Sequence, residues 1–533
     1  MTQIKSQKFI LWVLILLLTI TFIIRLSGLT FSPPGFFCDE ASIGYNAYSI
    51  LMTGKDEKGI AWPVFFKAFG DFKNPVYIYL ATFPIKFFGL EVFSVRIASA
   101  ILGIGSILLF IYFLYLIKRD WTFALAGGLV MSLMPWHFQF SRIAFEAISM
   151  VFFITLDMVL FALFHKTKRP TLYLLFGLSM VITFFTYSTG RLIVPVSALL
   201  VVFLWRREIF WNERYRINIL ISILVTALLG LILVYDHLID PAGILTRPHD
   251  VLIIDDNPPI FTAAERFFEN YFSHLSPEFL FQHGDLNYRH SAGVSSMLLT
   301  SFFFPLLAGL VYFIGRFKKS RGAAFLVIQF FLFPVASSIT VINEGAQATR
   351  TIHIVPFLAI IITCGFWQLF KFLGGRHRYL TAAILIFALF ESAMFYKYYF
   401  VAYPVSAGAI YNFNGGMPEA LEFAFSQKAP YYYVSTSVCQ YRIEIPFFMK
   451  YPPAEFQKSL VFPNARCIYP KKIVNPIPGS IAVYKTGDPI EHFPREKLLK
   501  TVTAVKKTVR QEIGTQRELY ENKEIELYYV YQY

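Results

Sequence analysis

The sequence is poor in charged residues, acids above all, and in cysteine. Charged residues make up 15% of its 533 residues, and only 34 of them are Asp or Glu. Soluble globular proteins carry about 25% charged residues, so this composition excludes a soluble enzyme. A hydrophobic fraction of 56% excludes a disordered chain. Four cysteines without a CxxC pair exclude a zinc or thiol-redox framework.

Long apolar runs take the place of charge. A bilayer core needs about 20 apolar residues per helix. The run at 9–29 predicts an uncleaved signal anchor, because it continues into Phe31, Pro33 and Pro34 without a small-residue cleavage site. Further runs predict spans at about 94–117, 121–137, 147–164, 171–187, 191–205, 217–236, 294–314, 323–342, 351–371 and 379–400. We therefore expect a mainly α, polytopic membrane protein with about eleven transmembrane helices, within a range of about 11–13.

Basic residues gather in alternate short loops, on the side of the amino terminus. These loops lie near 118–119, 166–169, 206–216, 316–321 and 371–378. Cytoplasmic loops accumulate Lys and Arg, so the net charge of +14 indicates topology and gives no reason to expect nucleic-acid binding. Two long loops, at about 31–93 and 237–292, are then extracytoplasmic. That side is the outer face of a cytoplasmic membrane in a prokaryote, or the lumen of the endoplasmic reticulum in a eukaryote.

The tail differs in composition from the rest, so we expect a transmembrane domain at 1–400 and a small extracytoplasmic α/β domain at 401–533. Pro418 suits the first turn of a helix at 419–427. Segments 431–437, 481–484 and 524–529 read as strands. In an oxidising compartment, both a Cys439–Cys467 disulfide and two free thiols are compatible with the sequence.

Two adjacent acids, Asp39 and Glu40, follow the first span at the outer membrane surface. Neighbouring residues do not share a helix face, so the two carboxylates should meet different partners. One would accept a proton while the other orients a substrate or a cation. The alternative is a solvated loop with a helix cap.

Other charged residues stand at the outer ends of several predicted helices. Asp71 and Lys73 precede an aromatic run, and Arg142 and Glu146 are four residues apart, where they could also simply pair with each other. The remaining members of this group are Arg191, Asp285, Arg289, His290, Glu344 and Arg350. Together they predict a pocket for an anionic headgroup, which points to membrane lipid as a partner.

Three acids fall inside or near the ends of predicted spans, namely Asp157, Asp236 and Glu391. Acids at the midplane would suit a proton-coupled or ion-coupled transporter, or a flippase for a lipid-linked or anionic substrate. Buried partners of nearby hydroxyl groups are the other interpretation. Long outer loops and an outer domain favour an enzyme.

Several segments resemble the membrane glycosyltransferases of the GT-C class, in particular glycosyltransferase family 39, which includes relatives of protein O-mannosyltransferases and of the lipid A aminoarabinose transferase. The segments are PPGFFCDEASIGYNAYSI (33–50), FGDFKNPVYIYL (69–80), FSVRIASAILG (93–103), PWHFQFSRIAFEA (135–147), YSTGRLIVP (187–195), HLSPEFLFQHGDLNYRH (274–290) and QATRTIHIVPFLA (347–359). The resemblance covers most of the membrane part, and the acidic pair in the first outer loop is its most specific mark.

The resemblance implies a GT-C fold and inverting transfer of a sugar from a polyprenyl phosphate to an acceptor outside the cytoplasm. It implies Asp39 as the base with Glu40 beside it, and Glu146 as a second carboxylate that orients the acceptor. Asp71 and Lys73 would approach the sugar phosphate, although relatives often place the lysine directly before proline and here Asn74 intervenes.

The resemblance also bears on the phosphate and on cofactors. The cations left for the donor phosphate are Arg289, His290 and Arg350, followed by Arg191 and by Arg96, for which a helix-end role is the alternative. Arg142 is a further candidate for the same phosphate. Relatives in this branch generally need no cofactor, so none is expected, although clustered carboxylates near a phosphate are compatible with a divalent cation.

Overall fold

The structure is a computed structural model that describes residues 2–69, 71–210, 213–239, 252–253, 258–293, 296–340, 345–373, 378–438, 443–460, 462, 464–468, 477–485, 498–511 and 518–532. Its contacts divide the chain into two compact units, each assembled from separate stretches of sequence. Unit 1 contains 1–27, 70–77 and 99–395, and unit 2 contains 28–69, 78–98 and 396–533. The first outer loop therefore clusters with the tail.

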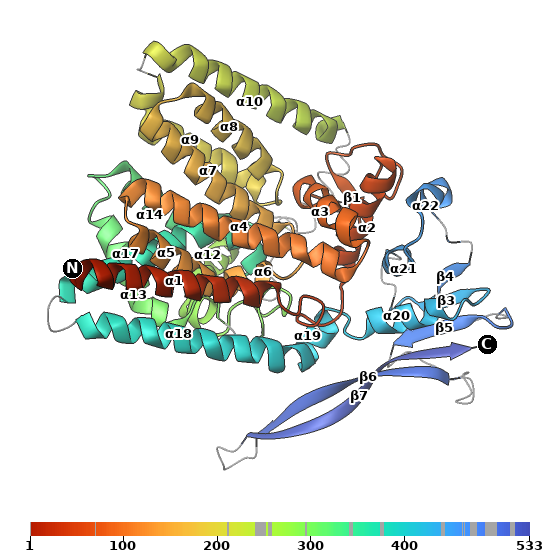
Figure 1. Cartoon of the computed structure of the whole chain (residues 1–533). Coiled ribbons are helices and arrows are strands. Elements are labelled where there is room, and N and C mark those ends of the chain that lie inside the picture. The colour runs from red at the N-terminus through yellow and green to blue at the C-terminus, as the bar shows by residue number, and fades with distance from the viewer. Residues whose placement is uncertain are drawn as a thin grey trace. The chain divides into compact units, whose positions relative to one another are not determined.

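Unit 1 is a bundle of apolar helices, many of which run alongside one another (Figure 1). Its helices are α1 (Thr2–Leu26), α5 (Trp121–Leu133), α6 (Pro135–Phe140), α7 (Ala147–Thr167), α8 (Pro170–Phe184), α9 (Gly190–Phe210), α10 (Glu213–Ile239), α12 (Ile260–Leu275), α13 (Phe303–Ile314), α14 (Arg321–Leu332), α15 (Val335–Ser338), α16 (Ala348–Thr351) and α17 (Val355–Leu373). Helices α3 (Pro75–Phe88), α4 (Val92–Lys118) and α18 (Arg378–Val401) each pass from one unit into the other.

Small residues allow a close contact in unit 1 between helices α13 and α17. A Cβ added to Gly365 would lie 1.7 Å from the carbonyl oxygen of Pro305, and one added to Gly309 would lie 2.0 Å from that of Ile361. Helices in a bilayer associate mainly by close packing, so glycines at the contact stabilise this pair.

The predicted spans coincide with helices. Each of the eleven apolar runs overlaps at least one helix of the structure. Among the described residues, six helical segments are long and apolar enough to cross a membrane: those beginning at Gln7, Val92, Ala147, Arg321, Ala348 and Tyr379. Five shorter apolar helical segments accompany them. The prediction of a polytopic, mainly α membrane fold is confirmed.

Unit 2 contains the first outer loop and the tail. Its elements are α2 (Cys38–Thr53), β1 (Phe66–Ala68), α19 (Ala407–Asn412), α20 (Met417–Ser426), β3 (Tyr432–Ser435), α21 (Glu444–Phe448), α22 (Pro453–Ser459), β4 (Ala465–Ile468), β5 (Ile481–Lys485), β6 (Leu498–Gln511) and β7 (Glu518–Gln532). Unit 1 holds the short strand β2 (Asp71–Lys73).

The tail carries a five-stranded mixed sheet in the order β4-β3-β5-β7-β6. Strands β3, β4 and β5 pair in parallel, whereas β7 pairs antiparallel with both β5 and β6. Figure 1 shows β6 and β7 continuing as a two-stranded ribbon beyond β5. Helix α20 and strands β3, β5 and β7 confirm the predicted α/β domain, while β4, β6, α21 and α22 were not predicted.

Helix α2 packs against the tail helices α21 and α22. A Cβ on Gly44 would lie 2.6 Å from the ring of Phe447, so the absence of a side chain on α2 admits that ring. At the far end of α2, Gln457 donates to Ser49 Oγ and Thr53 Oγ1, both at 2.9 Å. The tail therefore contacts α2 at its middle and at its carboxyl end.

Candidate functional site

The first outer loop places its two acids in the first turn of α2, where negative charge is favourable next to the helix amino terminus. The side chain of Asp39 is partly exposed, whereas that of Glu40 is fully buried. Because they are neighbours on one helix, the two carboxylates face different surroundings.

Arg96 holds Glu40 in a buried ion pair. Arg96 Nε donates to Glu40 Oε1 at 2.8 Å and Nη2 to Oε2 at 2.7 Å, and both side chains are 0% exposed. The same guanidinium donates to the carbonyl oxygens of Leu29, Pro33 and Gly35 at 2.8–2.9 Å. Arg96 therefore fixes the backbone that leads into α2. The sequence offered Arg96 as a secondary candidate for the donor phosphate, with a helix-end role as the alternative.

A clamp around Asn74 joins three other candidates in unit 1. Glu146 accepts from the Asn74 backbone N–H at 2.8 Å and from its side-chain amide at 2.9 Å, while Arg191 Nη2 donates to Asn74 Oδ1 at 3.4 Å. Lys73 precedes the clamp and is half-buried, and the side chain of Asp71 lies outside the described part of the structure. Asn74, a departure from the family pattern, thus connects Glu146 to Arg191.

Arg142 caps a helix. Its guanidinium is buried and donates to the carbonyls of Ile24 and Arg25 at 2.8 and 2.7 Å, at the carboxyl end of α1. Arg25 in turn reaches the carbonyl of Ser132 at 2.6 Å and lies 3.3 Å from His137 Nδ1. The sequence analysis did not single out Arg25, although a lone arginine within the apolar run at 9–29 could have indicated a buried polar partner.

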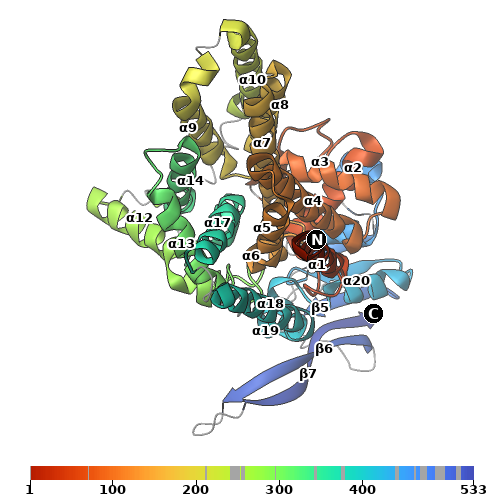
Figure 2. The same ribbon diagram turned by 60° about the vertical axis from the view of Figure 1, so that its left-hand side comes forward.

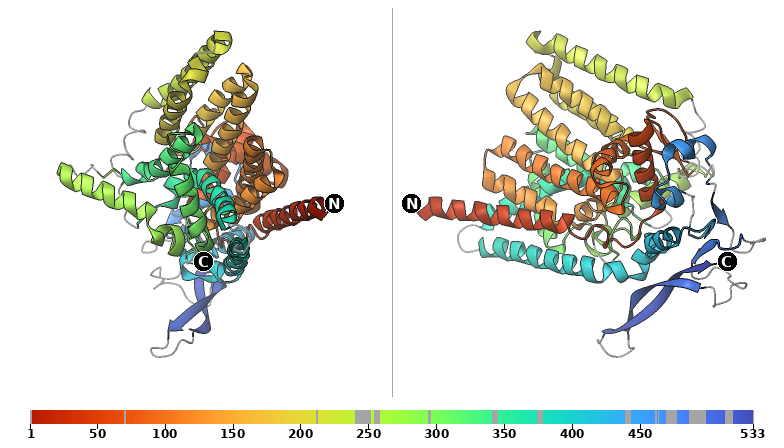
Figure 3. Two further views of the ribbon diagram at one scale, coloured as in Figure 1. Left: turned by 90° about the vertical axis from the view of Figure 1, so that its left-hand side faces the viewer. Right: turned by 45° about the vertical axis from the view of Figure 1, so that its right-hand side comes forward.

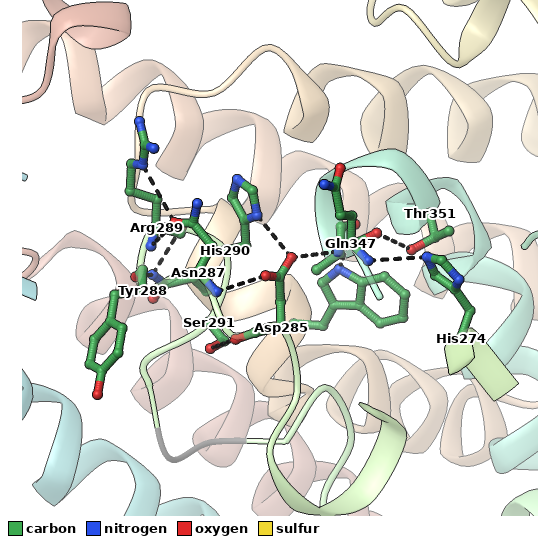
Figure 4. A network of polar contacts seen from close by, with 12 residues as sticks. His274, Asp285, Asn287, Tyr288, Arg289, His290, Ser291, Gln347 and Thr351 are labelled. Carbon is green, nitrogen blue, oxygen red and sulfur yellow. Dashed lines mark hydrogen bonds and ion pairs between the residues drawn. The ribbon is translucent and has the colours of Figure 1, made fainter. Parts of the chain in front are cut away.

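Asp285 is the centre of a second polar network, shown in Figure 4. Its Oδ1 accepts from the Asn287 N–H at 2.9 Å. Its Oδ2 accepts from His290 Nδ1 at 2.8 Å and from the Ala348 N–H at 2.7 Å. Asp285 accepts the hydrogen on Nδ1 of His290, and none of the described residues forms a hydrogen bond with Nε2 of that ring. Arg289 Nε lies 3.4 Å from Asn287 Oδ1.

His274 connects helix α12 to Gln347, which directly precedes the Ala348 that donates to Asp285. Its Nδ1 faces the Asn270 carbonyl at 2.6 Å, so Nδ1 carries the hydrogen and Nε2 accepts from the Gln347 N–H at 3.1 Å. Burial lowers the pKa of His274 to about 4, which keeps the ring neutral at pH 7. Three residues on, Arg350 donates to Thr340 Oγ1.

The acids within the spans have structural partners. Asp157 Oδ2 accepts from Thr183 Oγ1 at 2.7 Å, and Glu391 accepts from the backbone N–H groups of Thr300 and Ser301 at the start of a helical turn. The side chain of Asp236 and all of Glu344 lie outside the described residues. Two of the three acids that suggested a transporter are therefore partners of a hydroxyl group or a helix terminus.

Within the described residues, no group of three or more His, Cys, Asp and Glu side chains is placed to hold a metal ion. Cys467 is disulfide-bonded, whereas Cys38 and Cys364 are free. The predicted partner Cys439 lies outside the described residues.

Comparisons with known proteins identify the fold. No protein-family model and no curated protein sequence matches the chain. The crystal structure of ArnT from Cupriavidus metallidurans bound to undecaprenyl phosphate aligns with a TM-score of 0.52 and 12% identity, over 97% of this chain and 98% of that chain. ArnT in the apo state gives a TM-score of 0.53 at 12% identity, over 97% of both chains.

A second kind of protein also matches. The Archaeoglobus fulgidus oligosaccharyltransferase tethered with an acceptor peptide aligns with a TM-score of 0.50 and 14% identity, over 82% of this chain and 63% of that chain. At these identities the likeness concerns the fold. The chain is a polytopic membrane protein with the GT-C glycosyltransferase fold and a carboxyl-terminal sheet domain, as its sequence resemblance predicted.

Proposed function

We propose that this protein is an inverting glycosyltransferase that moves a sugar from a polyprenyl-phosphate donor to an acceptor on the extracytoplasmic side of the cytoplasmic membrane. The observation that carries the proposal is the start of α2, where the Arg96–Glu40 pair fixes the backbone that presents the partly exposed carboxylate of Asp39. The fold supports the donor class, because the matching ArnT structure holds undecaprenyl phosphate. The acceptor is a protein hydroxyl, a lipid headgroup or a growing glycan.

Asp39 is our base. Its carboxylate takes the proton of the acceptor hydroxyl while the acceptor oxygen forms a bond to the anomeric carbon. The bond between that carbon and the phosphate oxygen breaks, and its electron pair leaves with the polyprenyl phosphate. Glu40 has both oxygens bound by Arg96, so we assign it a positioning role.

The leaving phosphate needs cations or hydrogen-bond donors, which act where charge develops. We assign this task to Lys73, to Arg191 beside the Asn74 clamp, and to His290, whose ring is oriented by Asp285 and packs beside Phe140 and Phe145. Arg289 and Arg350 flank the same network as further candidates.

Glu146 and Arg142 receive different roles. Asn74 holds the Glu146 carboxylate, so Glu146 is suited to orienting the acceptor or Arg191. Arg142 acts through the end of α1, which it caps.

The first experiment compares lipids that co-purify with wild-type protein and with Asp39→Asn, identified by mass spectrometry. A variant that binds the donor but cannot deprotonate the acceptor should accumulate a glycosylated polyprenyl phosphate. The mass of that lipid would identify the sugar as a hexose or a pentose and give the prenyl length. Incubation of the wild type with candidate acceptors should then discharge the lipid, in the presence or absence of EDTA, since we propose a reaction without a metal.

Glu455→Gln is the matched control, because Glu455 is an exposed acid in the first turn of α22, as Asp39 is in that of α2. It should keep wild-type activity. Full activity in Asp39→Asn would refute the base assignment. Ordinary phospholipids alone on both proteins, with no transfer from a supplied undecaprenyl-phosphate sugar, would refute the transferase and direct attention to substrate counterflow in liposomes.

A further inference from the structure

Helix α12, in the second long outer loop, exposes a stripe of phenylalanines. Phe261 is 86% exposed, Phe268 is 54% exposed and Phe272 is 62% exposed. At 3.6 residues per turn, positions separated by seven and eleven residues fall within an arc of about 40°. Three large aromatic side chains therefore share one face of the helix.

The opposite face of α12 is anchored to the protein. Asn270 donates to the carbonyls of Ser338 and Thr340 at 3.3 and 3.0 Å, and buried His274 receives the Gln347 N–H. Both residues lie roughly 180° to 220° around the helix from Phe261. The stripe is thus directed away from the contacts that hold the helix.

Next to the stripe lies a helical segment that is long and apolar enough to span a membrane. Tyr271 Oη donates to the carbonyl of Phe331 at 2.6 Å, and Phe331 is itself 48% exposed on a helical segment, Arg321–Ser338, that can span a membrane. Figures 2 and 3 show α12 running across the direction of α1 and α18 rather than alongside them. A helix that lies across the spanning helices with one apolar face has the geometry of an interfacial helix.

We propose that α12 lies in the membrane interface, with Phe261, Phe268 and Phe272 inserted at the boundary between lipid headgroups and acyl chains. The exposed charged residues beside the stripe are Glu265, Arg266 and Glu269, which sum to no positive charge. The contact is therefore apolar and does not depend on anionic lipid. Through His274 and Gln347 it sets the depth of the segment that carries Arg350. The inference stands independently of the proposed transferase activity.

Spin labels on α12 test the depth directly. Phe268→Cys and Arg266→Cys, each carrying a nitroxide, are reconstituted in phosphatidylcholine vesicles, and the spectrum of labelled wild type is subtracted because Cys38 and Cys364 are free. Collisions with oxygen should exceed those with the polar complex NiEDDA at position 268, and the order should reverse at position 266, which is exposed on the polar flank. Adding phosphatidylglycerol should leave both ratios unchanged.

Other outcomes overturn the proposal. Collisions dominated by NiEDDA at both 268 and 266 would mean that both positions face water. Spin–spin broadening at 268 that disappears on dilution with unlabelled protein would mean that a second copy covers the stripe. A label at Phe272→Cys repeats the measurement if the variant at 268 does not fold, and a NiEDDA-dominated signal at 272 would likewise overturn the proposal.

Discussion

Glu40→Gln should destabilise the segment around Asp39 far more than its conservative chemistry suggests. The substitution keeps the size of the side chain but removes the charge that compensates Arg96, and both residues are fully buried. Two charge-assisted hydrogen bonds of 2.8 and 2.7 Å are lost or weakened, each contributing about 1.5–3 kcal/mol. Removing one partner of a buried ion pair costs about 3–5 kcal/mol, so we expect a loss in that range.

Cys38 provides the assay, because it is a free, buried thiol next to Asp39. When opening of the segment is fast and reversible, the rate of maleimide modification reports its opening free energy. A loss of about 3–5 kcal/mol should raise that rate roughly a hundredfold to several thousandfold, at about 1.4 kcal/mol per factor of ten. Cys364→Ser serves as the background, so that Cys38 is the free thiol measured.

Glu91→Gln is the control, since Glu91 pairs with Lys450 in an exposed contact whose side chains are 46% and 56% exposed. Surface pairs contribute about 0–1 kcal/mol, so the Cys38 rate should change by less than about fivefold. The reasoning is refuted if maleimide modifies Cys38 at the same rate in the Glu40→Gln and Glu91→Gln variants.

Three further predictions concern the second network and the tail. Asp285→Asn should weaken the affinity for undecaprenyl phosphate, measured by calorimetry, by about ten- to a hundredfold, because the charged hydrogen bonds to His290 and to the Ala348 N–H are lost. The rate of maleimide modification of Cys38 should stay unchanged and serves as the control. Because the folded-state pKa of His274 is about 4, below its usual 6.5, the unfolded chain protonates first on acidification. Stability should therefore fall by about 3 kcal/mol between about pH 6.5 and pH 4, and a denaturation series of His274→Gln should lack that slope. Gln457→Ala removes the hydrogen bonds to Ser49, Thr53 and the Asp56 carbonyl, so proteolytic cleavage between residues 54 and 62 should become faster. An unchanged cleavage rate would show that these hydrogen bonds do not hold the loop.

The elements that sequence reasoning predicted best are those with a local signal. Runs of about 20 apolar residues predicted helices because a bilayer requires an uninterrupted apolar stretch. Helix α2 has no such run, so the sequence places its residues in the first outer loop, although this helix carries Asp39. The short strand β4 was missed because four residues carry little periodic signal, and it forms only by pairing with β3.

The candidate site shows the same division. Asp39 was identified by its place after the first span and by family resemblance, neither of which needs coordinates. Asn74 looked like an interruption of the family pattern, and only its contacts with Glu146 and Arg191 indicate what it holds. Arg142 and Arg191 looked alike in sequence, yet one caps α1 and the other reaches Asn74.

The sequence by itself determined that this is a membrane protein of many apolar helices with a small α/β tail, because apolar length and composition act locally along the chain. Only the tertiary structure decided which hydrogen-bond or ion-pair partner each charged side chain has. Three buried carboxylates bind partners that are distant in sequence: Glu40 binds Arg96, 56 residues away, Glu146 binds Asn74, 72 residues away, and Asp285 binds Ala348, 63 residues away. The sequence offers many chemically equivalent cations and amides, and helix packing selects one partner for each buried carboxylate, since a buried charge without a partner is costly.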